Sequence, residues 1–222
     1  MITTIRMNDK LLRQQIFIFD VLERNIYMVN EKDPRVLRTR QLINEAFRIL
    51  LQKKDFDAIT IKDIAEKASI NRATFYAHYE DKYALLEEIT EQAFYNMTPE
   101  EVMHAEKFTD EICNKLILLT HDYIVTFYKI CGWNSKSIAT LVDEKIKKML
   151  QQMIESIFLK DNTFCIKDNL NTKIISAMTC SAIYSATYSW FMAGENDRMD
   201  LLVDIVRPYV MKGLDLYNNR DV

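Results

Sequence analysis

Apolar residues recur at intervals of three and four over most of this 222-residue chain, the spacing of one face of an α-helix. Short polar stretches interrupt the pattern and divide it into separate helices. Only three glycines and three prolines occur, which favours long helices with short joints over sheets rich in tight turns. We therefore predict an all-α fold. The predicted helices cover residues 33–53, 61–68, 72–79, 81–97, 109–131, 138–157, 171–192 and 197–218, with one break near Val142-Asp143.

The most informative stretch runs from Asp57 to Lys82. Thr60 is a favourable N-cap with an acid three residues later, and apolar positions then continue at helical spacing to Ala68. The segment 69–71 breaks this pattern, and Asn71 can cap a second helix. Two short helices joined by a tight turn are the helix-turn-helix pattern, whose second helix enters the major groove of DNA. The alternative is a helical hairpin buried inside an all-α domain.

Two runs of sequence, TIKDIA at 60–65 and ASINRATFYAHYEDKYALL at 68–86, resemble the DNA-binding domain of the TetR/AcrR family of bacterial transcriptional regulators. The resemblance extends from Arg38 to about Leu86. Its most specific residues are Thr74-Phe75-Tyr76, His78-Tyr79, Asp81-Lys82 and Leu85. Ser69 stands where the family often has glycine. The resemblance implies a three-helix helix-turn-helix domain at the N-terminal side, followed by a larger helical domain for ligand binding and dimerisation.

This organisation predicts three segments. Residues 33–82 form the DNA-binding domain, a helix over 81–97 links it onward, and residues 98–222 form the C-terminal helical domain. Residues 1–32 form an extension with a helix-compatible apolar stripe from about Asn8 to Val29. Two interpretations of this extension remain open. It is an extra helix packed on the body or on a partner subunit, or translation of the native protein starts at Met28.

The charge distribution agrees with a DNA-binding module ahead of an acidic body. From Asp33 to Lys82 there are ten Lys/Arg against eight Asp/Glu, a net +2. From Tyr83 onward there are fourteen against twenty, a net −6. The four cysteines have no metal-ligand spacing, and we expect neither a metal nor another cofactor. No apolar run reaches eighteen residues, so we expect a cytoplasmic protein without a membrane segment.

The candidate DNA contacts divide into base readers and phosphate anchors. Arginine pairs with guanine in the major groove, and methyl groups suit the thymine methyl. The base candidates on the second helix are Arg72, Ala73, Thr74 and Ala77. Four phosphate candidates come from the resemblance, and a fifth comes from its place near the start of the first helix. They are Thr60, Tyr76, His78 and Lys82, and Arg38.

The region after residue 98 lacks the signs of an enzyme, and we expect none. Its one Glu-x-x-His spacing, Glu101 to His104, has no second copy, and no glycine-rich phosphate loop occurs. Aromatic and sulfur-bearing side chains are frequent, which suits an apolar pocket, and in most family members this region binds an inducer. The alternative, for any single one of these side chains, is that it only packs in the hydrophobic core. The pocket candidates are His104, His121, Phe127, Cys131, Met153, Tyr184 and Tyr188.

The last two predicted helices carry broad apolar faces. Family members dimerise by packing two such helices from each subunit into a four-helix bundle, and small residues on the first helix favour this over a role in the monomer core. The dimer candidates are Ile175, Thr179, Ala182, Ile183, Ala186, Trp190, Leu202, Ile205 and Tyr209. We expect a homodimeric repressor released from a palindromic double-stranded operator by a small hydrophobic or aromatic ligand. The alternatives are control by a protein partner, or an all-α interaction module without DNA binding.

Overall fold

The computed structural model describes residues 33–131, 136–163, 169–195 and 198–217. Every regular element in these ranges is helical, which confirms the predicted all-α fold. The elements are α2 (Pro34–Leu51), η1 (Phe56–Ala58), α3 (Ile61–Lys67), α4 (Arg72–Tyr76), α5 (Lys82–Met97), α6 (Glu100–Met103), α7 (Asp110–Cys131), α8 (Lys136–Lys160), α9 (Asn169–Met192), α10 (Met199–Leu214) and η2 (Asp215–Tyr217). The chain divides into two compact units, residues 1–43 and 44–222, so the division falls inside α2.

Three side-chain caps set the starts of α3, α4 and α5. Thr60 and Asp63 form a reciprocal capping box at α3, as their spacing predicts. Asn71 accepts from the Thr74 N–H at 2.7 Å and so begins α4. Asp81 accepts from two N–H groups of the first turn of α5, each at 2.8 Å. These caps satisfy backbone donors that a helix start otherwise leaves unpaired. Local sequence therefore determines where the helix-turn-helix elements begin.

The turn between α3 and α4 places a serine in a left-handed conformation. Ser69 has a φ of 56°. Its N–H donates to the Glu66 carbonyl at 3.2 Å, and the Ile70 N–H donates to the Ala65 carbonyl at 2.9 Å. This pair of bonds is the Schellman motif, in which the left-handed residue after the helix is most often glycine. The serine completes the turn, but its β-carbon is strained there.

We expect Ser69→Gly to stabilise the domain by roughly 0.5–1 kcal/mol, because relief of left-handed strain exceeds the extra entropy that glycine has in the unfolded chain. Urea unfolding followed by circular dichroism measures the change. Ser156→Gly inside α8 is the matched control and should be destabilising, since its backbone is right-handed helix. A loss of stability in Ser69→Gly similar to that of the control would show that the turn carries no strain.

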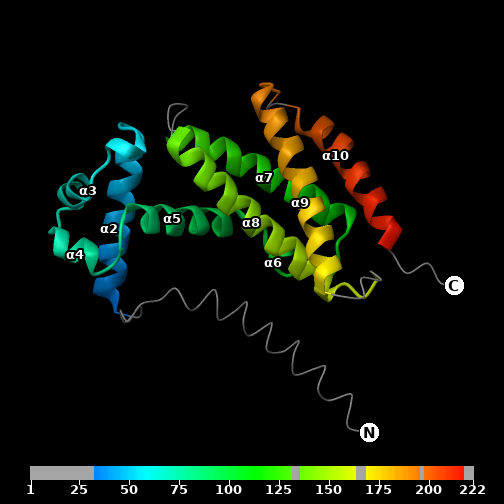
Figure 1. Ribbon diagram of the computed structural model, residues 1–222, viewed down its shortest axis with the longest axis horizontal. Coiled ribbons are helices and arrows are strands. Elements are labelled where there is room, and N and C mark those ends of the chain that lie inside the picture. Colours follow the sequence, from blue (N-terminus) through cyan, green and yellow to red (C-terminus); the bar gives the residue numbers. More distant parts are fainter. Residues whose placement is uncertain (1–32, 132–135, 164–168, 196–197, 218–222) are drawn as a thin grey trace, which may run out of the picture. The chain divides into compact units, whose positions relative to one another are not determined.

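Helices α7 to α10 pack together as the body of the molecule, and α5 contacts both α7 and α8 (Figure 1). Helix α8 is continuous through residues 142–143, so the predicted break there was wrong. Its buried side chains keep one face through that point, since Ile138, Val142, Ile146 and Leu150 are all fully or almost fully buried. Packing along this whole face favours one straight helix.

Some helix ends differ from the prediction for local reasons. Thr98 closes α5, because its hydroxyl donates back to the Phe94 carbonyl at 2.8 Å. Helix α4 ends at Tyr76, and α10 passes into a 3₁₀ turn after Leu214. The predictions for residues 1–32 lie outside the described residues. Within the part of the chain that is described, no helix is both long and apolar enough to cross a bilayer.

Candidate nucleic-acid interface

The recognition helix α4 has one buried side and one exposed side. Phe75 is fully buried and packs against Tyr79, with the two ring centroids 5.8 Å apart. Arg72, Ala73 and Ala77 are all exposed, as is Tyr76 at 56% of its surface. A helix with this division presents a cation, two methyl groups and a phenol to whatever lies against it. Three of the four base candidates thus share an exposed surface.

The two threonine candidates already use their hydroxyl groups. The Thr74 hydroxyl donates to Asn71 Oδ1 at 3.0 Å, within the α4 cap. The Thr60 hydroxyl donates to Asp63 Oδ2 at 2.8 Å and accepts from the Asp63 N–H. The Thr60 backbone N–H, the Thr60 hydroxyl and Lys54 lower the pKa of Asp63 to about 2. Each hydroxyl keeps acceptor capacity but already donates its one proton, Thr60 as the cap of α3 and Thr74 to Asn71, the cap of α4.

Lys82, a phosphate candidate from the resemblance, is hydrogen-bonded within the chain. Its Nζ atom donates to the carbonyls of Phe56 at 2.8 Å, Ile59 at 3.0 Å and Asp57 at 3.3 Å. It also lies 4.4 Å from the centroid of the Phe56 ring. An ammonium has three protons, and all three are used here. Lys82 therefore fastens the start of α5 to the segment between α2 and α3.

Tyr79 holds the residues that follow the C-terminal end of α4. Its hydroxyl is hydrogen-bonded to Glu88 on α5 at 2.8 Å and lies 3.3 Å from Asn44 on α2. The neighbouring candidate His78 is half-buried. Arg38, the remaining phosphate candidate, is exposed in the first unit of the chain. Tyr79 thus ties the segment after α4 to α5, while Lys82 ties the start of α5 to the segment before α3.

A cavity of about 240 Å³ lies where the C-terminal part of α2, helix α5 and helix α7 meet. Its wall combines mainly apolar side chains with a few polar ones. The lining residues are Arg48, Leu51, Leu86, Ile89, Thr90, Ala93, Asn96, Met97, Tyr123, Thr126 and Phe127. Of the predicted pocket residues, only Phe127 belongs to this wall.

The other pocket candidates lie elsewhere. His104 is exposed at the end of α6, while Glu101, its partner in the Glu-x-x-His spacing, pairs with Lys115 at 2.9 Å. His121 is buried, with Nδ1 at 3.3 Å from an Asp122 oxygen. Met153 is half-buried on α8. The side chain of Cys131 lies outside the described residues.

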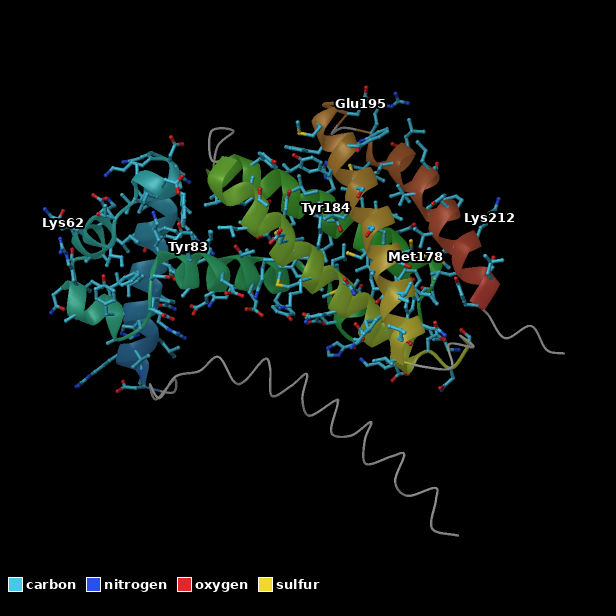
Figure 2. The ribbon with its side chains drawn as sticks, viewed as in Figure 1. Lys62, Tyr83, Met178, Tyr184, Glu195 and Lys212 are labelled. Atoms are coloured by element: carbon cyan, nitrogen blue, oxygen red, sulfur yellow. The ribbon has the colours of Figure 1, made fainter. Side chains whose placement is uncertain are left out.

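Tyr184, labelled in Figure 2, stacks on Tyr188 within the body, with the ring centroids 6.3 Å apart. The Tyr184 hydroxyl donates to Asp143 on α8, and the Tyr188 and Tyr128 hydroxyls are 3.2 Å apart. Burial, together with these hydrogen bonds, raises the pKa of Tyr184 and Tyr128 far above the usual value for tyrosine. Both therefore stay neutral, and the buried Tyr184 and half-buried Tyr128 connect α7, α8 and α9 through their hydrogen bonds.

Helix α5 is joined to the body by an ion pair as well as by packing. Lys145 on α8 places Nζ 2.6 Å from Glu87 and 3.5 Å from Glu91, both on α5. The Lys145 side chain is only 19% exposed, so solvent weakens this pair less than a fully exposed one. The body and the DNA-binding domain thus share α5 as a common element.

The structure separates the predicted dimer residues into two groups. Ile175, Thr179, Ile183 and Leu202 are buried within the single chain, so they have little surface to offer a partner. Ala182, Ala186 and Trp190 are half-buried, and the Trp190 indole donates to the Glu195 carbonyl. Ile205 and Tyr209 remain 57% and 75% exposed. The exposed large apolar residues of α9 are instead Leu170, Ile174, Met178 and Met192, of which Met178 is labelled in Figure 2.

A helix-turn-helix whose second helix is exposed, joined through a shared helix to an all-helical body, defines the class of DNA-binding regulators. Residues 43–89 match the family model described as "Bacterial regulatory proteins, tetR family". A stretch of 62 residues is 45% identical to the "Uncharacterized HTH-type transcriptional regulator YxbF" of Bacillus subtilis (strain 168). That stretch spans 28% of this chain and 16% of that relative. Residues 43–89 therefore carry the DNA-binding domain sequence of the TetR family of regulators.

Solved structures share the fold over most of the chain. A putative TetR-family transcriptional regulator from Mesorhizobium loti has a TM-score of 0.58 and 18% sequence identity, over 84% of this chain and all of that one. RolR, in complex with the ligand resorcinol, has a TM-score of 0.50 and 17% identity, over 78% of this chain and 89% of that one. At these identities the likeness extends the family fold to the body and carries no information about its ligand.

Proposed function

We propose that this protein is a homodimeric transcriptional repressor that binds a palindromic operator and releases it when a small apolar ligand occupies the cavity. The exposed surface of α4 is the observation that carries the proposal. Arg72, Ala73, Tyr76 and Ala77 are exposed, and the opposite side of the helix is anchored by Phe75. A helix of this form fits the major groove, with Arg72 at the N-terminal end where base contacts are made.

Specific binding by such a short helix requires a second copy, because one half-site contains too few bases for useful discrimination. Exposed apolar side chains on α9 and α10 support a dimer. Met178 on α9 and Tyr209 on α10 are 62% and 75% exposed, which is unfavourable in a monomer unless a partner covers them. Pairing of these helices across a two-fold axis would set the distance between two recognition helices.

The cavity supports control by a ligand, because its wall includes both the DNA-binding domain and the body. Arg48 and Leu51 come from α2, and Thr126 and Phe127 come from α7. A ligand that favours one spacing of these helices shifts the protein toward that conformation. Release then requires that the favoured conformation no longer matches the half-site spacing.

The proposal is tested by titrating the purified chain against DNA from its own upstream region, with and without excess nonspecific competitor. We expect competitor-resistant binding, a footprint over a palindrome, and affinity that falls steeply as salt increases. Equal affinity for random DNA in both this experiment and a genome-wide selection of bound fragments would refute sequence-specific regulation.

We expect Arg72→Ala to relax the sequence preference and to weaken operator binding by roughly 1–3 kcal/mol, since a bidentate arginine–guanine contact is lost. Competition between the operator and its single-base variants measures the preference. Lys107→Ala, which removes an equal charge from an exposed position outside the helix-turn-helix, is the control. A uniform loss of affinity in Arg72→Ala, without change in preference, would assign Arg72 to the phosphate backbone.

A further inference from the structure

The charges around the cavity indicate the chemistry of its ligand. Arg48 is the one charged residue among those that line it. The remaining polar residues, Thr90, Asn96, Tyr123 and Thr126, are neutral, and no carboxylate belongs to the wall. We propose that the cavity binds a small amphipathic monoanion, an apolar carboxylate whose charged end pairs with Arg48. This inference rests on the proposed role of the cavity as the effector site.

The guanidinium of Arg48 is available for such a ligand. Arg48 is exposed, and across the described ranges no carboxylate lies within ion-pairing distance of it. Lys145, a cation on α8 that faces α5, is by contrast already paired with Glu87 and Glu91. Arginine binds a carboxylate through two parallel hydrogen bonds, which gives both affinity and orientation. Arg48 thus fits the charged end of the ligand.

The rest of the wall fits an apolar ligand body. Five lining residues have apolar side chains, namely Leu51, Leu86, Ile89, Met97 and Phe127. Thr90 is buried, and its backbone carbonyl lies 3.4 Å from the Tyr123 hydroxyl. An apolar group buried here gains hydrophobic stabilisation without leaving a buried charge. A second charge on the ligand would have no partner in the wall and would be costly to bury.

The volume limits the size of the ligand. The cavity volume of about 240 Å³ is below the range of about 300–1,000 Å³ typical of drug-sized ligands. The fitting class is a carboxylate on a single ring or on a short alkyl chain. Benzoate and hexanoate are suitable probes. Benzamide and benzylamine have nearly the same shape as benzoate, but they are neutral and cationic.

The position of Arg48 also relates binding to regulation. Arg48 lies on α2, while Thr126 and Phe127 lie on α7 in the body. A ligand that pairs with Arg48 at one end and packs against α7 at the other contacts both the DNA-binding domain and the body. An anion therefore has a direct interaction with the DNA-binding domain, which a purely apolar ligand in the body would lack.

Calorimetric titration of the full chain with the four probes tests the inference. We expect benzoate and hexanoate to bind about tenfold or more tightly than benzamide, and benzylamine to bind weakest. Arg48→Gln should lower benzoate affinity to that of benzamide and leave benzamide unchanged, whereas Lys107→Gln should change neither. Ala93→Leu, which fills part of the cavity wall, should weaken both benzoate and benzamide. Melting temperatures of the free variants establish that each is folded.

Equal affinity for benzoate and benzamide, unchanged benzoate binding in Arg48→Gln, or no carboxylate binding at millimolar concentration would each overturn the inference. Operator release is measured separately and distinguishes it from the proposed function. Operator release by a neutral or cationic molecule would be consistent with the proposed regulator but would overturn the inference that its ligand is a monoanion. Arg48-dependent carboxylate binding without any change in operator affinity would support the ligand class and refute effector control through this cavity.

Discussion

Lys82→Met is expected to destabilise the helix-turn-helix by roughly 2–4 kcal/mol, because it removes a charged donor from several backbone carbonyls at once. The ammonium serves Phe56, Asp57 and Ile59, and methionine keeps the length and apolar stem of the side chain without its protons. The part-buried carbonyls of Phe56 and Ile59 would then lose a hydrogen-bond partner. The attraction between the ammonium and the Phe56 ring is lost as well.

Thermal unfolding followed by circular dichroism, together with hydrogen exchange of the α3 and α4 amides, measures this loss. The salt dependence of operator binding provides the second reading. If Lys82 acts through structure, the folded variant keeps the salt slope of the original chain, since no phosphate contact is removed. Lys62→Met on exposed α3 is the control and should change stability little, because its pairing with Glu66 is a surface ion pair. Unchanged stability with a reduced salt slope would return Lys82 to the phosphate backbone.

Sequence alone located the helix-turn-helix because its signals are local. Thr60 with Asp63, Asn71 and Asp81 act within three residues of their positions, and the structure has each as a cap. The role of Lys82 depends on Phe56, 26 residues away along the chain, and no spacing rule relates the two. A family resemblance supplies a place for such a residue, but only the packed geometry shows which groups take its protons.

The body illustrates a different limit. Helix α9 carries apolar or small residues on almost every side, so its periodicity does not distinguish a face toward the core from a face toward a partner. Contacts with α7, α8 and α10 decide this, and they bury Ile175 and Ile183 while leaving Ile174 and Met178 exposed. The cavity was missed for a related reason. Its wall joins Arg48, Asn96 and Thr126 from helices far apart in the sequence, and none of them stands in a recognisable motif.

The double variant Met178→Asp, Tyr209→Asp is expected to convert the proposed dimer into a folded monomer. Both side chains are largely exposed on α9 and α10, so a single chain tolerates the charge, whereas a two-fold interface would bring like charges together. Operator affinity should fall by about 100-fold or more, because binding of the second half-site would no longer be intramolecular. Sedimentation equilibrium measures the mass, and titration with the intact operator measures the affinity.

Leu141→Asp and Met103→Asp provide the matched controls, since they place the same charge at exposed apolar positions on α8 and α6. They should leave both the mass and the affinity unchanged if the interface consists of α9 and α10. A double variant that remains dimeric would assign the exposed residues of α9 and α10 to another role. A variant that is monomeric yet keeps its operator affinity would instead separate dimerisation from DNA recognition, and then the half-site argument for the dimer fails while the role of α4 stands.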